Sequence, residues 1–442
     1  MKKIGLGLIG LILAAAIYYF AIGASRLTQE VRMHVDTQLA SLQKEGFKIE
    51  QRHIKEKKEH FIISFDDTRK ISTFLYRKGV QITAEDAEMF KGLKLGVDIH
   101  YLPDISSLLS LDIYPHALPH VITTSLRDKR ELLKQIEEIL KNKTLLIHLM
   151  LNKTASSFKG HMKDINETIK DAQQMATLHS KELTFEGKIT KNSIYAFKQT
   201  LQNLSFILSD GLKISLSGLK SNYKVTGKTL YDYTTNYQIE EAVVDIQSIT
   251  QIRLRDIRVD SASIVKENLA SGTMKISIAQ TNITNSKKPY DLEHFNFEVK
   301  ASNIDISTID QMQQADLSNE KVMNSLLKQL FSKGVVFEVT ALSLEHIKSD
   351  GKKIEGFDLA AQLTFAENFD FPALERNPLS ALNAINADAK LTFSNELFAL
   401  MAEQPPIMMV LMMFPPKDKH NKKEYILELK KGNVTVNGKT VM

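Results

Sequence analysis

Hydrophobic and polar residues alternate along most of the chain from about residue 47 onward. Runs such as LKISLSGLKSNYKVTG and IRLRDIRVDSASI place apolar side chains at every second position, which indicates strands with one buried face. Gly, Asn, Asp and Ser separate these runs at short intervals. This rhythm favours antiparallel meanders over alternating strand and helix units, and it predicts a long sheet built from similar hairpins.

Two longer segments show helical spacing instead. Ser125–Lys141 has an apolar stripe among charges, and Thr308–Lys333 has a similar stripe with a break expected near Ala315–Ser318. Leu379–Ile385 and Asn395–Ala402 are shorter candidate helices. We therefore predict an α+β protein, mostly antiparallel β, with long curved sheets and a few packed helices.

A loose repeat occurs inside the strand region. Ile214–Leu219, Ile252–Ile257 and Leu342–Ile347 share the order apolar-x-Leu-x-x-apolar. The irregular spacing of these three segments excludes a strict solenoid. Two interpretations stay open: similar hairpins added to one sheet, or the ordinary composition of any amphipathic hairpin.

The N-terminus carries an apolar segment, because Ile4 to Gly23 is free of charged residues. As a helix it would be about 30 Å long, the thickness of a bilayer core. Tyr18–Phe20 lie near its outer end, and Lys2 and Lys3 precede it. Aromatic rings prefer the membrane interface, and basic residues stay on the cytoplasmic side. We expect a single-pass inner-membrane anchor at residues 1–24, with a cytoplasmic N-terminus and the bulk of the chain in the periplasm.

A cleaved signal peptide is the alternative, since Ala21-Ile22-Gly23 fits a small-x-small cleavage pattern. The apolar run is longer than a usual signal sequence, which favours the uncleaved anchor. Helical spacing in Ser25–Glu45, with Gly46 as a C-cap, predicts a juxtamembrane helix at residues 25–46. The expected domains are then an N-terminal α+β region at 47–200 and a C-terminal β-rich region at 201–442.

Composition narrows the class of protein. The 442 residues are 43% hydrophobic and 25% charged, as in a folded chain, and the formal net charge is +5. Acids interrupt the basic stretches Lys55–Lys58 and Lys417–Lys423, so we expect no nucleic-acid partner. These stretches indicate either a solvated surface or a patch that faces anionic lipid headgroups. With no Cys, disulfides and thiolate chemistry are excluded.

The sequence offers few candidate catalytic or metal-binding residues. His116 and His120 have the spacing of metal ligands on a helix, but Pro119 argues against that helix. Asp66 and Asp67 would point to opposite faces of a strand, which disfavours a proton-sharing pair. The chain contains none of the common hydrolase, zinc-protease or nucleotide-binding motifs. We expect no enzyme activity, no metal and no cofactor.

Two local features remain as candidate sites. Asn166, within DINET, is a candidate glycosylation acceptor. Near the C-terminus, two Pro-Pro pairs enclose an apolar run that is too short to span a bilayer. The run is either a buried plug that closes the end of a sheet or an exposed contact surface for lipid or a partner helix. Its candidate contact residues are Ile407, Met408, Met409, Leu411, Met412, Met413 and Phe414.

The C-terminal segments suggest a family. GVVFEVTALSLEHIKSDGKKIEGFDLAAQLTF, INADAKLTFSNELFALMA and YILELKKGNVTVNGKTVM follow one another behind the N-terminal apolar segment. In this order they resemble the YdgA-like family of Gram-negative envelope proteins, a family of unknown function with distant similarity to AsmA-like proteins. The resemblance implies an inner-membrane anchor and a large β-rich periplasmic domain, and it supplies no catalytic residue.

Three functions are compatible with these observations. We expect a non-enzymatic envelope protein that holds lipid acyl chains in a β-lined groove and supports envelope maintenance, with a phospholipid as partner. The alternative is a structural or assembly module that docks to an envelope protein machine through a sheet edge or the Met-rich run. A hydrolase with dispersed catalytic residues is the least favoured.

Overall fold

The described chain forms two compact units, one ending at Lys224 and the other beginning at Val225. The expected boundary after residue 200 falls inside β10 (Ser193–Leu208), which pairs with β8, β9 and β11 of the first unit. The computed structural model describes residues 28–77, 84–171, 174–190, 193–285, 289–315, 319–349, 351–367, 369, 382–404, 408, 411 and 413–441.

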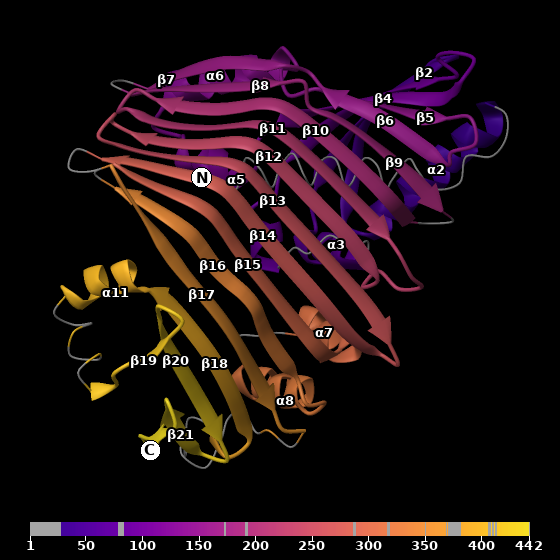
Figure 1. The fold of residues 1–442 in the computed structure, drawn as a ribbon. Helices are drawn as coiled ribbons and strands as arrows, with labels where there is room; N and C mark the ends of the chain where they lie inside the picture. The colour runs from indigo at the N-terminus through magenta and orange to yellow at the C-terminus, as the bar shows by residue number, and fades with distance from the viewer. Residues whose placement is uncertain are drawn as a thin grey trace. The chain divides into compact units, whose positions relative to one another are not determined.

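The first unit is an antiparallel sheet with helices (Figure 1). Strands β1 to β6 pair in chain order, and β6 then pairs with β9. The long strand β10 pairs with β9 along its first half, with β8 along its second half, and with β11 on its other side. The remaining elements of this unit are α2 (Thr28–Lys44), β1 (Phe47–Ile54), β2 (Lys58–Phe65), α3 (Thr68–Arg77), α4 (Ala84–Glu88), β3 (Lys94–Tyr101), β4 (Ser107–Ala117), α5 (His120–Ser125), α6 (Arg130–Lys141), β5 (Ile147–Asn152), β6 (Ser157–Met162), β7 (Ile165–Asp171), β8 (Gln174–Lys181), β9 (Thr184–Thr190) and β11 (Leu212–Val225).

One large hydrophobic core stabilises the first unit. Phe61, Ile99 and Leu111 lie at its centre and are fully buried. Helix α2 contributes Val35, Leu39 and Leu42 to this core, as expected for apolar residues on one helical face. The predicted helix at residues 25–46 is therefore confirmed from Thr28 to Lys44.

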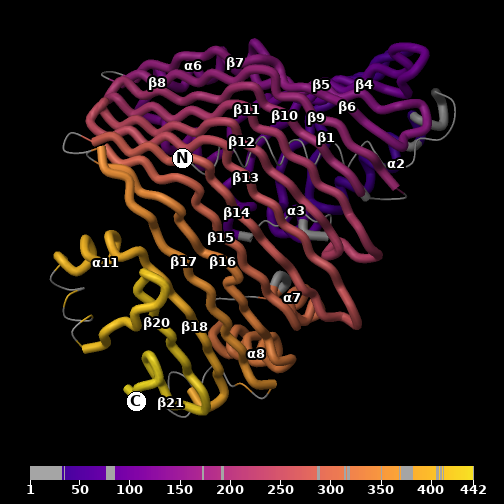
Figure 2. The backbone as a smooth tube through the Cα atoms, in the orientation of Figure 1, coloured from indigo at the N-terminus to yellow at the C-terminus, as the bar shows by residue number. Residues whose placement is uncertain are grey.

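The second unit is an antiparallel meander, as the alternating pattern predicts. Its strands pair in the order β12-β13-β14-β15-β16-β17-β18-β20, and β19 and β21 both pair with the outer edge of β20. Figure 2 follows these long strands side by side from magenta to yellow. The elements are β12 (Tyr233–Ile246), β13 (Thr250–Lys266), β14 (Leu269–Asn285), β15 (Tyr290–Asp305), α7 (Ile306–Gln314), α8 (Glu320–Phe331), β16 (Val336–Ser349), β17 (Lys352–Phe365), β18 (Ile385–Ser394), α11 (Asn395–Ala402), β19 (Lys417–Lys419), β20 (Lys422–Lys430), β21 (Asn433–Val436) and β22 (Lys439–Thr440).

The helix predictions were mostly correct. Thr308–Lys333 forms α7 and α8, and Asn319 caps the start of α8 by accepting hydrogen bonds from two backbone amides. The prediction of Asn395–Ala402 matches α11. Ser125–Lys141 is wrong as one helix, because Lys129 has a non-helical backbone between α5 and α6. Of the candidate Leu379–Ile385, Ile385 begins a strand and residues 379–381 lie outside the described residues.

The loose sequence repeat has a regular structural basis. Gly218, Asp256 and His294 each have positive φ inside a long strand, and they follow one another at intervals of 38 residues. Gly218 lies in Ile214–Leu219, Asp256 in Ile252–Ile257 and His294 in Tyr290–Phe295. All three segments have the order apolar-x-Leu-x-x-apolar. The third segment named from the sequence, Leu342–Ile347, does not fit this interval, because it belongs to β16, which runs in the opposite direction to β15.

Each positive-φ residue shifts the apolar alternation by one position. Leu216 and Leu219 are three residues apart on β11, yet both pack against the core of the first unit. A regular strand would place them on opposite faces. The left-handed residue between them, Gly218, therefore keeps the apolar side chains of a long strand on one face.

Replacing Asp256 with Gly should raise the free energy of unfolding by about 0.5–1 kcal/mol, because Gly adopts positive φ without steric cost. The matched control is Asp260→Gly in the same strand, where φ is not positive and Gly should destabilise the protein. Urea unfolding measures both changes. Equal losses of stability in the two variants would contradict the argument from backbone conformation.

Candidate functional site

The sheet of the second unit carries a continuous apolar row across eight neighbouring strands. Cross-strand partners project from the same face of a sheet, so the register defines the row. Its members, from β12 to β20, are Tyr237, Val259, Ile276, Phe297, Leu342, Leu359, Leu391 and Tyr425.

A second apolar row lies two residues further along each strand and therefore on the same face. Its members are Ile239, Ile257, Ile278, Phe295, Leu344, Phe357 and Phe393, and on β20 the row ends at Lys423. We call the two rows together the apolar band. At about 4.8 Å per strand spacing, seven intervals make the band roughly 34 Å long.

The residues between the two rows project from the opposite face, and all of them are polar. They are Gln238, Arg258, Ser277, Asn296, Ser343, Asp358, Thr392 and Glu424. The sheet is thus strongly amphipathic over its whole width. An amphipathic sheet normally covers its apolar face with another layer.

Within the second unit, the described helices cover only the ends of this face. Helix α8 packs Leu327 and Leu330 into a small core with Leu363 and Leu429. Helix α11 contacts β17, β18 and β20, and the Lys423 ammonium lies 5.7 Å from the Phe398 ring centre. Most members of the apolar band remain half-buried, and Tyr237 is exposed.

Tyr425, at the β20 end of the band, carries a buried hydroxyl. Among the described residues this hydroxyl has no hydrogen-bond partner. Burial raises the pKa of Tyr425, so the phenol stays protonated near neutral pH. A polar donor is thus held at the end of an otherwise apolar row.

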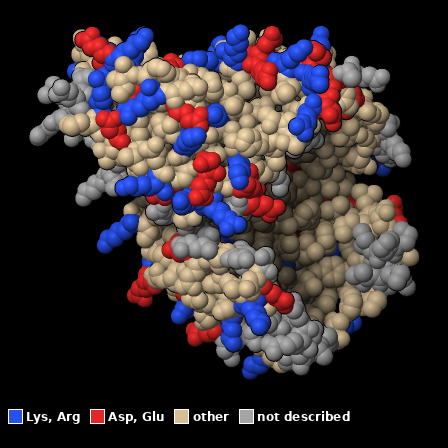
Figure 3. Space-filling model, turned by 180° about the vertical axis from the view of Figure 1, so that it is seen from behind, with Lys and Arg blue, Asp and Glu red and all other residues tan. Residues whose placement is uncertain are grey.

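The surface charge is mixed rather than segregated. Figure 3 shows Lys and Arg side chains next to Asp and Glu over the described part of one face. Nucleic-acid binding proteins instead gather cations into a patch or stripe. The absence of a nucleic-acid partner stays a prediction.

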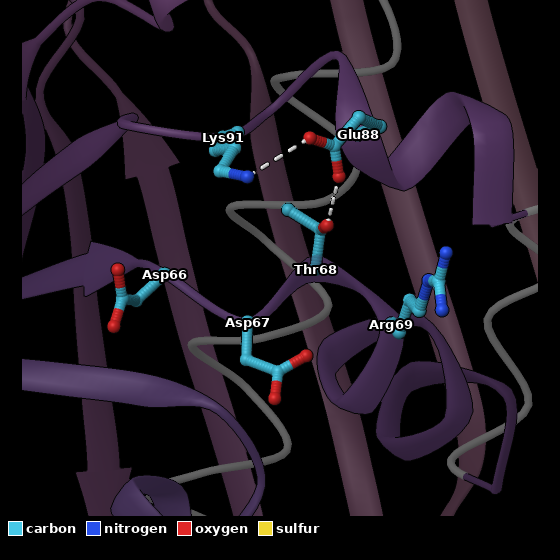
Figure 4. A pocket seen from close by; sticks show the side chains of 6 residues that line it. All are labelled: Asp66, Asp67, Thr68, Arg69, Glu88 and Lys91. Carbon is cyan, nitrogen blue, oxygen red and sulfur yellow. Dashed lines mark hydrogen bonds and ion pairs between the residues drawn. The ribbon is translucent and has the colours of Figure 1, made fainter.

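A polar pocket in the first unit surrounds the Asp66–Asp67 pair (Figure 4). The two carboxylates point in different directions, and Asp67 pairs with Lys70. Glu88 accepts a hydrogen bond from Thr68 and lies 3.2 Å from the Lys91 ammonium, and these two contacts hold its pKa below the usual range. The pKa of Asp67 is lowered as well, because its carboxylate accepts a hydrogen bond from the Lys70 amide and pairs with the Lys70 ammonium.

The Met-rich run is described in part. Met408 and Met413 are 47% and 69% exposed, and Leu411 and Phe414 are half-buried. Ile407, Met409 and Met412 lie outside the described residues. Of the two alternatives for this run, the exposed methionines favour the contact surface over the buried plug.

The other candidate residues lie apart. His116 is on β4 and His120 begins α5, where its ring packs against Gly92. Asn166 is exposed on β7, whose described partner is β8, and glycosylation there stays a prediction. Among the described residues, no three His, Asp or Glu side chains are grouped as metal ligands.

A row of titratable residues on the first unit was missed by sequence reasoning. Across neighbouring strands, His60 pairs with Asp98, Asp98 with Asp112, and Asp112 with His148. Each histidine Nδ1 lies 2.7 Å from an aspartate oxygen. Only the strand register brings these residues together, so no local motif could have revealed them.

Replacing Lys143 with Met should destabilise the first unit by about 1 kcal/mol at pH 7. Burial alone would raise the pKa of Asp98, but the Lys143 ammonium at 2.8 Å and His60 together lower it. Because the pKa of Asp98 is lower in the folded state than in the unfolded state, its ionised form stabilises the protein at pH values above the unfolded-state pKa of about 3.9. This contribution to the free energy of unfolding is lost as the pH falls and Asp98 becomes protonated. The difference between wild type and variant should therefore shrink below pH ~4. The control is Lys134→Met, because the ion pair between Lys134 and Glu131 is exposed and should contribute little to stability. If the stability difference between wild type and Lys143→Met does not change with pH, the stabilising pair of Lys143 with Asp98 is contradicted.

Among the described residues, no helix is long and apolar enough to cross a membrane. The predicted anchor, Ile4 to Gly23, lies outside the described residues. No protein-family model, curated protein or solved structure matches the chain.

Proposed function

We propose that the second unit binds lipid acyl chains on its apolar band. The observation that carries the proposal is the pair of apolar rows with a fully polar row on the opposite face. Removing hydrocarbon from water contributes about 0.8 kcal/mol per buried methylene, and acyl chains consist almost entirely of methylenes. The half-buried apolar band can therefore bind acyl chains through hydrophobic contact alone, and no catalytic group is required for binding.

The protein then acts without catalysis, as an envelope protein of the YdgA-like type that supports envelope maintenance. In this proposal Ile4 to Gly23 anchors the chain in the inner membrane, and the two units lie in the periplasm. The roughly 34 Å length of the band exceeds the ~30 Å hydrocarbon thickness of a bilayer. The band therefore has room for more than one acyl chain. The Tyr425 hydroxyl supplies a hydrogen bond for a polar group at its end.

A docking module for an envelope protein is the second candidate. The exposed Met408 and Met413 favour it, because flexible Met side chains adapt to varied apolar partners. In that case the band would be covered by protein rather than by lipid.

Site-specific photocrosslinking in the full chain tests the proposal. A photoreactive phenylalanine analogue replaces Phe297, which belongs to the apolar band, and in a control it replaces Asn296 on the opposite face. Irradiation of intact cells should attach phospholipid at position 297 and not at 296. Crosslinks from 297 to protein alone would favour the docking module, and equal lipid capture at both positions would reject the band as the site.

A further inference from the structure

We propose that one end of the first unit rests on an anionic lipid bilayer. This end, which we call the basic tip, consists of the three turns at residues 54–58, 102–106 and 153–156, which join β1 to β2, β3 to β4 and β5 to β6. The inference goes beyond acyl-chain binding by the second unit and rests on the proposed N-terminal anchor.

Backbone contacts hold the three turns together. The Tyr101 amide donates to the Lys57 carbonyl at 2.9 Å, and the Lys153 amide donates to the Ser106 carbonyl at 3.1 Å. The start of α2 joins the same end, because the Arg32 Nη2 donates to the carbonyl oxygens of Lys55 and Glu56, each at 2.8 Å. The tip is therefore a defined surface and not a set of separate loops.

Apolar side chains protrude from this surface. Ile105 is 90% exposed, Ile54 is 50% exposed and Leu102 is 39% exposed. Leu102 also has a φ of 49°, a left-handed conformation that is rare for a bulky residue. Strained residues of this kind persist where the surrounding structure or a function requires them. Exposed isoleucine and leucine next to basic residues are suited to the boundary between headgroups and acyl chains.

The charge of the tip complements an anionic bilayer. Lys55, Lys57, Lys58 and Lys153 are exposed, and none of the ion pairs found among the described residues involves them. Two acids accompany them, Glu56 and Asp104. The Asp104 carboxylate is exposed, and it accepts hydrogen bonds from Ser106 and Ser107 of the same turn.

The length of the preceding chain brings this end to the membrane. The described part of α2 begins at Thr28, and the apolar segment ends at Gly23. Four residues span at most about 14 Å even when fully extended. Arg32 contacts the tip one turn into α2, so an inserted anchor would hold the tip close to the headgroups.

Fluorescence of the full chain in vesicles tests the proposal, and the absence of Cys allows clean labelling. Ile105→Cys carries an environment-sensitive dye, and Lys163→Cys, exposed at the opposite end of β6, is the control. Vesicles contain either phosphatidylcholine alone or a mixture with phosphatidylglycerol. With the anionic mixture, the dye at 105 should shift to the blue and lose access to an aqueous quencher, whereas the dye at 163 should stay accessible.

Charge variants provide the quantitative test. One lysine near an anionic surface contributes about 1 kcal/mol, so Lys57→Gln should lower the ratio of docked to undocked tip about fivefold. Lys163→Gln should leave this ratio unchanged.

Three outcomes would overturn the inference. They are equal quenching at positions 105 and 163, the same blue shift in neutral and anionic vesicles, and a chain that fails to float with vesicles. The last outcome would also reject the anchor, while lipid crosslinking at Phe297 would be unaffected. A blue shift at 105 that requires added envelope protein would assign the tip to a protein partner instead.

Discussion

Replacing Arg52 with Met is expected to lower the free energy of unfolding of the first unit by about 3–5 kcal/mol. Arg52 lies on β1, and its Nε donates to the Glu59 carboxylate on β2 at 2.6 Å. The Glu59 side chain is completely buried, so removal of the guanidinium leaves a carboxylate in the interior without its counter-ion. Urea unfolding monitored by circular dichroism measures the loss.

The surrounding contacts explain why this pair matters more than other ion pairs of the protein. The Tyr101 hydroxyl donates to the second Glu59 oxygen at 2.7 Å, and burial together with Glu59 raises the pKa of Tyr101. Arg52 also pairs with Asp36 on α2, and the Arg32 guanidinium lies over the Tyr101 ring. The network therefore joins α2 to the first strands of the sheet.

Two controls separate the buried pair from general effects of substitution. Arg69→Met removes an exposed arginine and should change stability by less than about 0.5 kcal/mol. Arg52→Met combined with Glu59→Gln should recover part of the loss, because the neutral amide is less costly to bury than an unpaired carboxylate. If Arg52→Met unfolds at the wild-type urea concentration, the network does not stabilise the first unit.

The Glu59 network also shows where sequence reasoning stops. Within the charged run from Lys55 to His60, nothing distinguishes Glu59 from its solvated neighbours. Its partner Tyr101 is 42 residues away, and the strand register alone brings them together. Local alternation identified the strands, because side-chain direction in a strand has a period of two. It could not identify the pairing of charges between strands.

The same limit applies to the apolar band. Each strand shows its own apolar positions in sequence, and the mostly antiparallel α+β fold followed from them. The alignment of Tyr237 with Tyr425 through six intervening strands depends on the registers of seven strand pairs. The Met-rich run is visible in the sequence because its residues are contiguous, whereas the members of the band are widely spaced.

A single acid in the apolar band should abolish lipid capture. In Ile276→Asp, the carboxylate stands between Val259 and Phe297, where the proposed acyl chain lies. A charged residue in hydrocarbon costs about 2.5–3.5 kcal/mol, so crosslinking to phospholipid should fall by roughly 100-fold. The measurement is the yield of lipid adduct from a photoreactive residue at Leu342 in the same row.

The matched control is Ser277→Asp, the next residue on the same strand. Ser277 is half-buried like Ile276, but it belongs to the polar row on the opposite face. Ser277→Asp should therefore leave the lipid adduct unchanged. Urea unfolding of both variants shows whether either substitution acts through stability. Equal loss of the adduct in two folded variants would mean that the apolar face does not select the lipid, whereas loss in Ile276→Asp alone would place the acyl chain on the band.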